Sequence, residues 1–299
     1  MRDRLRFAVF GGGLVVLLGA ALGIGALVGD PSERGVEHSG VVYDGSYRST
    51  GLSDSESGYT LADLSVPASP NRAGPLSFRI TGPDGAPVTR FAVRHEKPLH
   101  LVVARSDGAE YRHTHPAMAA DGTWSVEWTW AAPGTYRVFA DFAPETGDGS
   151  NGLVLSRTVT VAGDAAARPL PPAAETASVD GYQVRLQRDS GDLRFTVTRD
   201  GGPVTDLEPY LGAYAHLVGL HAPSLAYLHA HPQGEVGRTS PGPEVAFHAE
   251  PPVPGPYRLY FEFAHGGSVH TAEFTLEFEP LSTTPSTSGA GHHSGGEHR

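Results

Sequence analysis

The segment LHLVVARSDGAEYRHTHP spans residues 99–116, and AHLVGLHAPSLAYLHAHP spans residues 215–232. Both contain His-x12-His-x-His-Pro with a tyrosine two residues before the His-x-His pair, and the second segment lies 116 positions after the first. Each segment predicts a β-hairpin, because strand-forming residues lie on both sides of a turn, at Asp107-Gly108 and at Pro223-Ser224. The chain therefore contains one β-unit twice.

The similarity continues on both sides of the hairpins. FRITGPDGAPVT at 78–89 matches FTVTRDGGPVT at 195–205, and APGTYRVFADF at 132–142 matches VPGPYRLYFEF at 253–263. The segments are short, alternate apolar with polar residues, and are separated by turn residues about every 8–12 positions. This pattern predicts an all-β chain with two tandem immunoglobulin-like antiparallel β-sandwich domains, residues 58–162 and 180–280.

All three tryptophans of the chain lie in TWSVEWTW, residues 123–130. They fall on one face of a predicted strand, because strand side chains alternate with a period of two. We therefore expect them in a hydrophobic core rather than on a ligand-binding surface.

The N-terminus has the pattern of a membrane segment. Residues 7–29 contain no charged side chain, and Arg2, Arg4 and Arg6 precede them. About 20 apolar residues span a bilayer as a helix, and basic residues favour the cytoplasmic side. We therefore expect residues 1–29 to form a single N-terminal transmembrane helix, with the bulk of the chain extracytoplasmic at the cell membrane. A cleaved signal peptide is the alternative.

Three further segments are too polar or too rich in Pro and Gly to form a core. Residues 30–57 are expected to be a flexible spacer, residues 163–179 an Ala/Pro-rich linker, and residues 281–299 a disordered tail that contains His292, His293 and His298. The tail is a second candidate for weak metal binding.

The composition excludes several functions. The net charge is -11, which argues against a nucleic-acid partner. The chain has no cysteine, so disulfides, thiolate zinc sites and cysteine nucleophiles are excluded. Two methionines cannot build a thioether-rich Cu(I) site, whereas fifteen histidines remain.

The hairpins place histidines together. Pairing Ser106 with Ala109 puts His100 opposite His115, with His113 on the same face. The same register in the second hairpin puts His216 opposite His231, with His229 beside them. His270, aligned with Leu155 of the first unit, is a further candidate. Three imidazoles without a thiolate suit Cu²⁺ or Zn²⁺. The candidate metal ligands are His100, His113, His115, His216, His229, His231 and His270.

The hairpin segments, PGTYRVFADF and PGPYRLYFEF resemble those of bacterial envelope proteins that have one N-terminal anchor and His-x-His β-sandwich domains. These proteins are similar in kind to periplasmic copper-handling sandwiches. The resemblance covers residues 58–278 and implies a secreted β-sandwich with a link to metal.

The favoured function is a membrane-tethered extracytoplasmic receptor, buffer or relay for Cu²⁺ or Zn²⁺. The alternative is a non-catalytic immunoglobulin-like interaction module that binds an envelope protein and has structural histidines. A zinc enzyme is a third hypothesis, but no G-x-S-x-G, H-E-x-x-H or phosphate loop is present, and Glu110 aligns with Ala226. We therefore expect a protein that is not an enzyme. The sequence leaves open which metal binds and whether the two histidine groups act separately or at a shared interface.

Overall fold

The computed structural model describes residues 49–145, 152–189 and 191–279. Within these ranges the chain forms eighteen β-strands and no helix, so the all-β prediction is confirmed. The immunoglobulin-like arrangement stays a prediction. The described residues include no helix that is long and apolar enough to cross a membrane, and the expected membrane segment at residues 7–29 lies outside them.

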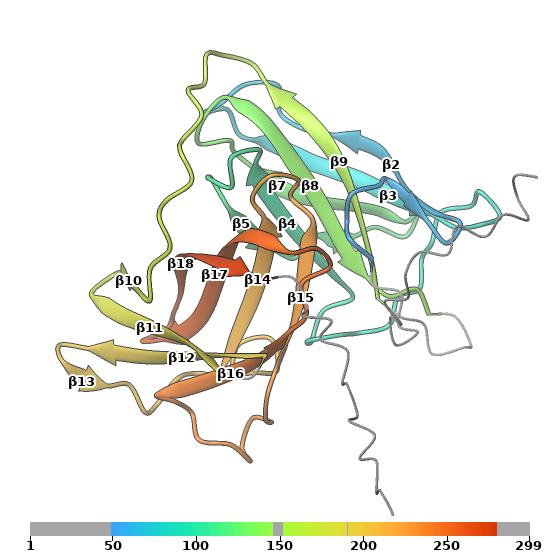
Figure 1. Ribbon diagram of the computed structural model, residues 1–299. Coiled ribbons are helices and arrows are strands. Elements are labelled where there is room, and N and C mark those ends of the chain that lie inside the picture. Colours follow the sequence, from blue (N-terminus) through green and yellow to red (C-terminus); the bar gives the residue numbers. More distant parts are fainter. Residues whose placement is uncertain (1–48, 146–151, 190, 280–299) are drawn as a thin grey trace, which may run out of the picture. The chain divides into compact units, whose positions relative to one another are not determined.

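The N-terminal half comprises strands β1 to β9 in two antiparallel sheets (Figure 1). One sheet has the order β1-β2-β3-β7-β6, and the other has the order β5-β4-β8-β9. The strands are β1 Ser55–Glu56, β2 Tyr59–Ser65, β3 Gly74–Thr81, β4 Leu99–Arg105, β5 Arg112–Thr114, β6 Ala117–Met118, β7 Thr123–Trp128, β8 Gly134–Phe142 and β9 Leu153–Val161.

Apolar side chains from both sheets of the N-terminal half enclose one core. Trp124, Trp128 and Trp130 are all buried there, which confirms the expectation from their alternation. Burial of such large side chains is the main favourable term for a sandwich of this size.

The C-terminal half comprises strands β10 to β18. They form one nine-stranded sheet in the order β10-β11-β12-β16-β15-β14-β17-β18, with β13 paired to β12, and a second core lies within it. The strands are β10 Thr176–Val179, β11 Tyr182–Asp189, β12 Asp192–Arg199, β13 Gly202–Pro203, β14 Ala215–His221, β15 Tyr227–Pro232, β16 Glu244–Ala249, β17 Gly255–His265 and β18 Ser268–Phe278.

The register of both histidine hairpins agrees with the sequence prediction where the strands pair. Val102 lies opposite His113 in the first hairpin, and Val218 lies opposite His229 in the second. The second hairpin then departs from the prediction, because β15 leaves β14 and continues along β16, where His231 lies opposite His248. The two ladders end at Leu101–Thr114 and at Val218–His229, so neither predicted pair, His100 with His115 or His216 with His231, belongs to a ladder. Strand β15 thus pairs with β14 through its first residues and with β16 through its last residues, and so joins the two parts of the nine-stranded sheet.

The register also corrects the alignment of His270. Phe142 pairs with Leu153, and its counterpart Phe263 pairs with His270. The equivalent of His270 is therefore Leu153 and not Leu155.

The two halves meet through equivalent faces. A third apolar cluster joins β4, β8 and β9 to β14, β15 and β17. The Tyr111 ring stacks on the Tyr260 ring, with centroids 3.8 Å apart. The Tyr227 and Phe139 rings also pack together, with centroids 5.6 Å apart. Tyr227 is the repeat counterpart of Tyr111, and Tyr260 is the counterpart of Phe139. The interface is therefore close to twofold symmetric, because each half contributes the same two positions.

Segments outside the strands reinforce this junction. The backbone N–H of Tyr227 donates to the carbonyl oxygen of Thr50 at 2.7 Å, and the Ser49 hydroxyl donates to the carbonyl of Val154 at 2.9 Å. Ser49 and Gly51 are buried, so residues 49–51, which the composition assigns to the spacer, pack against both halves. In the linker, the backbone N–H of Arg168 donates to the Asp107 carboxylate at 2.7 Å.

Candidate metal site

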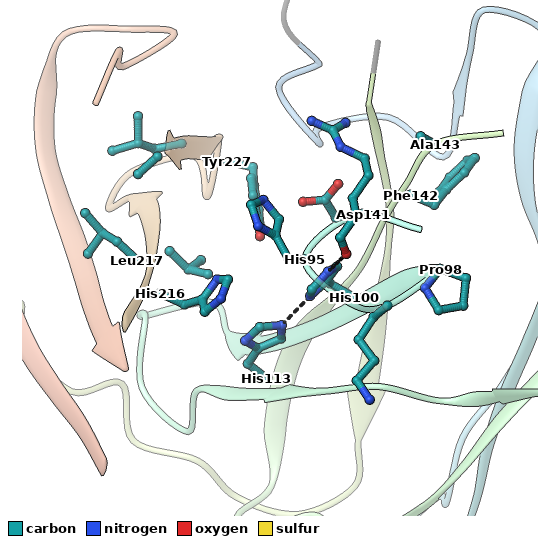
Figure 2. Close-up of a pocket in the computed structure, with 15 residues that line it drawn as sticks. His95, Pro98, His100, His113, Asp141, Phe142, Ala143, His216, Leu217 and Tyr227 are labelled. Atoms are coloured by element: carbon teal, nitrogen blue, oxygen red, sulfur yellow. Dashed lines mark hydrogen bonds between the residues drawn. The ribbon is translucent and has the colours of Figure 1, made fainter. Parts of the chain in front are cut away.

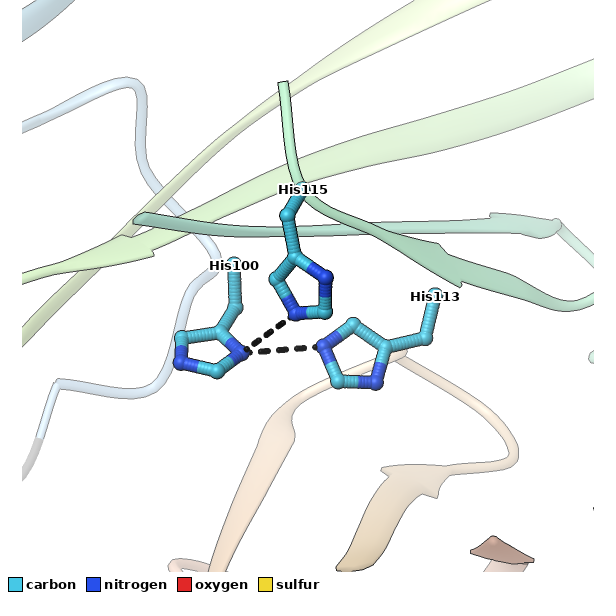
Figure 3. A group of neighbouring side chains, drawn as sticks. All are labelled: His100, His113 and His115. Carbon is cyan, nitrogen blue, oxygen red and sulfur yellow. Dashed lines mark hydrogen bonds between the residues drawn. The ribbon is translucent and has the colours of Figure 1, made fainter. Parts of the chain in front are cut away.

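Three histidines of the N-terminal half converge on one point (Figure 3). His100 belongs to β4, His113 belongs to β5, and His115 follows β5 directly. His100 Nδ1 lies 3.0 Å from His113 Nε2 and 3.1 Å from His115 Nε2. One nitrogen from each ring lies within 4.8 Å of the other two. The structure thus brings together the first predicted histidine group in full.

The other nitrogens of two of these rings have acceptors. His100 Nε2 donates to the carbonyl oxygen of Arg94 at 3.1 Å. His113 Nδ1 donates to Glu262 Oε2 at 2.7 Å, and both side chains are buried, with 3% and 4% exposed. Metal-binding histidines characteristically donate their second N–H to a carbonyl or carboxylate, which fixes the tautomer and the ring orientation.

These bonds decide what the facing nitrogens can do. A carbonyl and a carboxylate accept only, so His100 Nε2 and His113 Nδ1 must carry protons. In the neutral rings, His100 Nδ1 and His113 Nε2 are then both lone-pair acceptors, although they lie 3.0 Å apart. Two acceptors at this distance require a cation between them, either a proton or a metal ion.

Burial disfavours a proton on the His100 and His115 rings. It is the largest cause that lowers the pKa of His100 to about 4, although Asp141 partly opposes the shift. Burial likewise lowers the pKa of His115 to about 3, with His113 and His100 adding to the effect. Both rings are therefore neutral at pH 7, the protonation state that a metal ligand needs.

The histidine group borders a small cavity between the two halves (Figure 2). Its volume is about 50 Å³, and its lining includes His95, His100, His113, Asp141 and His216. Arg94 and Lys97 also line it. The cavity is polar and large enough for an ion with water ligands, since a bound water needs roughly 10–15 Å³ of such space.

The second predicted histidine group is described only in part. His216 reaches the same cavity, and its Nε2 donates to the carbonyl oxygens of Tyr210 at 3.1 Å and Leu211 at 3.2 Å. Tyr210 is the counterpart of Arg94, so His216 is anchored as His100 is. Burial lowers the pKa of His216 to about 3, with His95 next in effect. The backbones of His229 and His231 lie on β15, and their side chains are outside the described part of the structure.

The last predicted ligand, His270, lies elsewhere. Its Nδ1 contacts Asp180 Oδ2 at 2.8 Å, and its Nε2 contacts the His265 carbonyl at 3.2 Å. Its ring packs against Tyr182 and Phe263 in the C-terminal half, and it is absent from the cavity lining. The structure therefore does not bring His270 to the histidine group.

Three residues of the site were not recognised from sequence: His95, Asp141 and Glu262. The two acids occupy equivalent positions in the repeated segments PGTYRVFADF and PGPYRLYFEF, and each is the strand partner of a histidine, His100 or His216. An acidic residue at the same position of both repeated segments is a sequence signal that could have identified Asp141 and Glu262 as candidates. His95 has no histidine counterpart, because Leu211 occupies the equivalent position.

A family model described as a domain of unknown function (DUF8832) matches the chain twice, at residues 54–161 and 177–280. The two matches together cover more than half of the chain, so the chain belongs to this family. No curated protein matches the sequence.

Among solved structures, the chain is similar to one titled as the surface layer protein SbsC, domains 4-9. The identity is 11% and the TM-score is 0.21, with 73% of this chain and 30% of that chain covered. The chain thus spans under a third of the length of that structure, and a similarity of this size supports no conclusion about function.

Proposed function

We propose that this protein binds Cu²⁺ or Zn²⁺ through His100 Nδ1, His113 Nε2 and His115 Nε2, and that it serves as a receptor, buffer or relay for the ion. One observation carries the proposal: two buried lone-pair nitrogens face each other at 3.0 Å, while their partner nitrogens donate to Arg94 and Glu262. A divalent ion between the three nitrogens would accept their lone pairs and so remove the repulsion between the two facing acceptors. Three imidazoles without sulfur suit either metal.

We further propose that the protein is tethered to a membrane by residues 7–29 and meets its ion outside the cytoplasm. The uncharged run and the preceding arginines support this location. Membrane fractionation, followed by protease treatment of intact cells, tests it. Recovery of the intact chain in the cytosolic fraction would overturn the tether.

We propose binding without catalysis. Glu262, the carboxylate that contacts the histidine group, accepts a hydrogen bond from His113 and so orients that ring. A carboxylate used in this way supports a ligand and is not positioned as a general base for a metal-bound water.

The test compares metal uptake by the full chain and its variants, purified in detergent. In every protein the histidines outside the described residues are replaced by alanine: His38, His292, His293 and His298. After loading with Zn²⁺ or Cu²⁺ and gel filtration, elemental analysis gives the bound metal per chain. His113→Ala/His115→Ala should lose the tightly bound ion.

The matched control is His221→Ala/His265→Ala. His221 contacts Ser224 and His265 contacts Tyr182, and neither lines the cavity. The control should keep the ion. If the two double variants take up equal amounts of metal, the site proposal is wrong.

A specific observation favours one other function. Protonated His113 could donate to both His100 and Glu262, which would form a buried ion pair without metal. This arrangement fits the interaction module with structural histidines. It predicts no metal uptake by the parent protein and a large loss of stability in His113→Ala.

A further inference from the structure

His95 and His216 form a second imidazole pair in the cavity (Figure 2). Their ring centroids are 5.2 Å apart, at an interplanar angle of 85°. The three ring pairs within the first histidine group have centroid distances of 5.3, 4.9 and 4.9 Å. The His95–His216 spacing falls in the same range. Two imidazoles bound to one ion at about 2.0–2.1 Å place their centroids about 5 Å apart.

The hydrogen bonds of His216 leave a suitable donor atom. Its Nε2 donates to the Tyr210 and Leu211 carbonyls, so the neutral ring presents a lone pair at Nδ1. The same atom of His100, its counterpart in the repeat, faces the first ligand group. Symmetry between the halves therefore gives each half one anchored histidine with its Nδ1 available for an ion.

His95 adds a ligand that the repeat itself does not supply. It lies in a turn with a φ of 47°, and its counterpart Leu211 has a φ of 56°. The left-handed turn is thus common to both halves, whereas the imidazole is specific to the N-terminal half. His95 is close to both anchored histidines, because its ring centroid lies 6.0 Å from that of His100 and 5.2 Å from that of His216.

We propose that His95 and His216 bind a second transition-metal ion in this cavity, so that the junction of the two halves holds two ions. This inference rests on the proposed function of the first group. Water completes the coordination, for which the cavity of about 50 Å³ has room. Asp141 in the lining and Glu262 beside His113 offset the charge of the ions, against the basic Arg94 and Lys97.

The experiment is a Cu²⁺ titration of the full chain in the same tail-substituted background. Calorimetry gives the stoichiometry, and electron paramagnetic resonance reports magnetic coupling between neighbouring Cu²⁺ ions. The parent protein should bind two equivalents and show coupling. His95→Ala/His216→Ala should bind one equivalent without coupling, and His221→Ala/His265→Ala should bind two.

His95→Asn alone is the milder variant, because His95 is only half-buried, and it should weaken the second equivalent at least tenfold. One equivalent in the parent protein, unchanged in His95→Asn and in His95→Ala/His216→Ala, would overturn the second ion and leave the first proposal intact. No binding by the parent protein would overturn both. Two equivalents that persist in both His95 variants would place the second ion elsewhere and also overturn the inference.

Discussion

Single residues explain why the histidine group has its particular geometry. The deciding residue is Glu262, which belongs to the C-terminal half and yet fixes the tautomer of His113 in the N-terminal half. Its counterpart Asp141 is the strand partner of His100, as Glu262 is of His216. The repeat therefore supplies each half with an acid beside its anchored histidine, and the interface brings the acid of the C-terminal half to His113 of the N-terminal half.

Glu262→Gln tests this role. The amide can still accept a hydrogen bond, but it lacks the negative charge that raises the basicity of the His113 ring. We expect Zn²⁺ affinity at the first group to fall about 10–100-fold with unchanged stoichiometry. Competition with a chromophoric chelator measures it, and Glu127→Gln, an exposed acid on β7, is the control. Equal affinities in Glu262→Gln and the parent protein would show that Glu262 does not support the ligand.

Asp107 gives a pH-dependent contribution to stability. Burial alone would raise its pKa, but hydrogen bonds from the Arg105 guanidinium and from the N–H groups of Arg168 and Ala109 lower it from 3.8 to about 2. A lowered carboxyl pKa stabilises the fold above pH 4, and this contribution is lost as the pH falls from 3.8 towards 2. Asp107→Asn should therefore cost about 2 kcal/mol at pH 7.

Urea unfolding of both proteins at several pH values measures the difference. The free energies of unfolding of Asp107→Asn and the parent protein should converge as the pH approaches 2. A difference that stays constant between pH 7 and pH 2 would mean that the charge of Asp107 contributes nothing.

At the scale of elements, the hairpin between β4 and β5 is a docking element as well as a histidine support. The Tyr260 hydroxyl of the C-terminal half donates to the carbonyl of Gly108 at the hairpin tip. Gly108 has a φ of 75°, and a Cβ there would lie 2.9 Å from Arg258 Cγ. The turn therefore needs glycine for its backbone angle and also for the close approach of the other half.

A matched pair of glycine variants separates the cost of the left-handed backbone angle from the cost of the close contact with Arg258. Gly201 has a φ of 77° and nothing within 4 Å of an added Cβ. Gly201→Ala should therefore cost only the left-handed backbone strain, about 1 kcal/mol. Gly108→Ala should cost a further 1–3 kcal/mol or so, because the methyl group displaces Arg258. Chemical denaturation compares them, and equal losses would refute tight docking of the hairpin.

The pairing of the strands was only partly predictable from the sequence. The hairpin register was predictable, because the turn signals and the period of two fix which residues face each other as far as Val102–His113 and Val218–His229. The departure of β15 to β16 was not predictable, because it depends on how the sheet curls around its own core. His270 was misassigned for a related reason: alternation identified its face, but the strand register decides its neighbours.

At the scale of the whole molecule, the apolar contact between the halves should make them unfold together. Val102, Phe139 and Tyr227 are among its buried residues, each at most 5% exposed. All three tryptophans lie in the N-terminal half, so their fluorescence reports on that half alone. Circular dichroism reports on both halves, which makes the coupling measurable.

Phe247→Ala tests whether a loss of stability in the C-terminal half also lowers the stability of the N-terminal half. Phe247 is fully buried in the core of the C-terminal half, and its truncation should cost about 3–5 kcal/mol. If the halves unfold cooperatively, the midpoint of the tryptophan fluorescence transition falls together with that of circular dichroism. A fluorescence transition that keeps the parent midpoint would show that the halves unfold independently.

The sequence by itself determined the all-β class, the repeated histidine hairpins and the register of their paired residues, because alternation, turn chemistry and composition are local properties. Only the tertiary structure decided which histidines share a cavity, because His216 and Glu262 are far from His113 in sequence and come close to it through packing of the two halves. The question of separate or shared histidine groups depends on that packing. In the described part of the chain, both anchored histidines border one cavity at the junction.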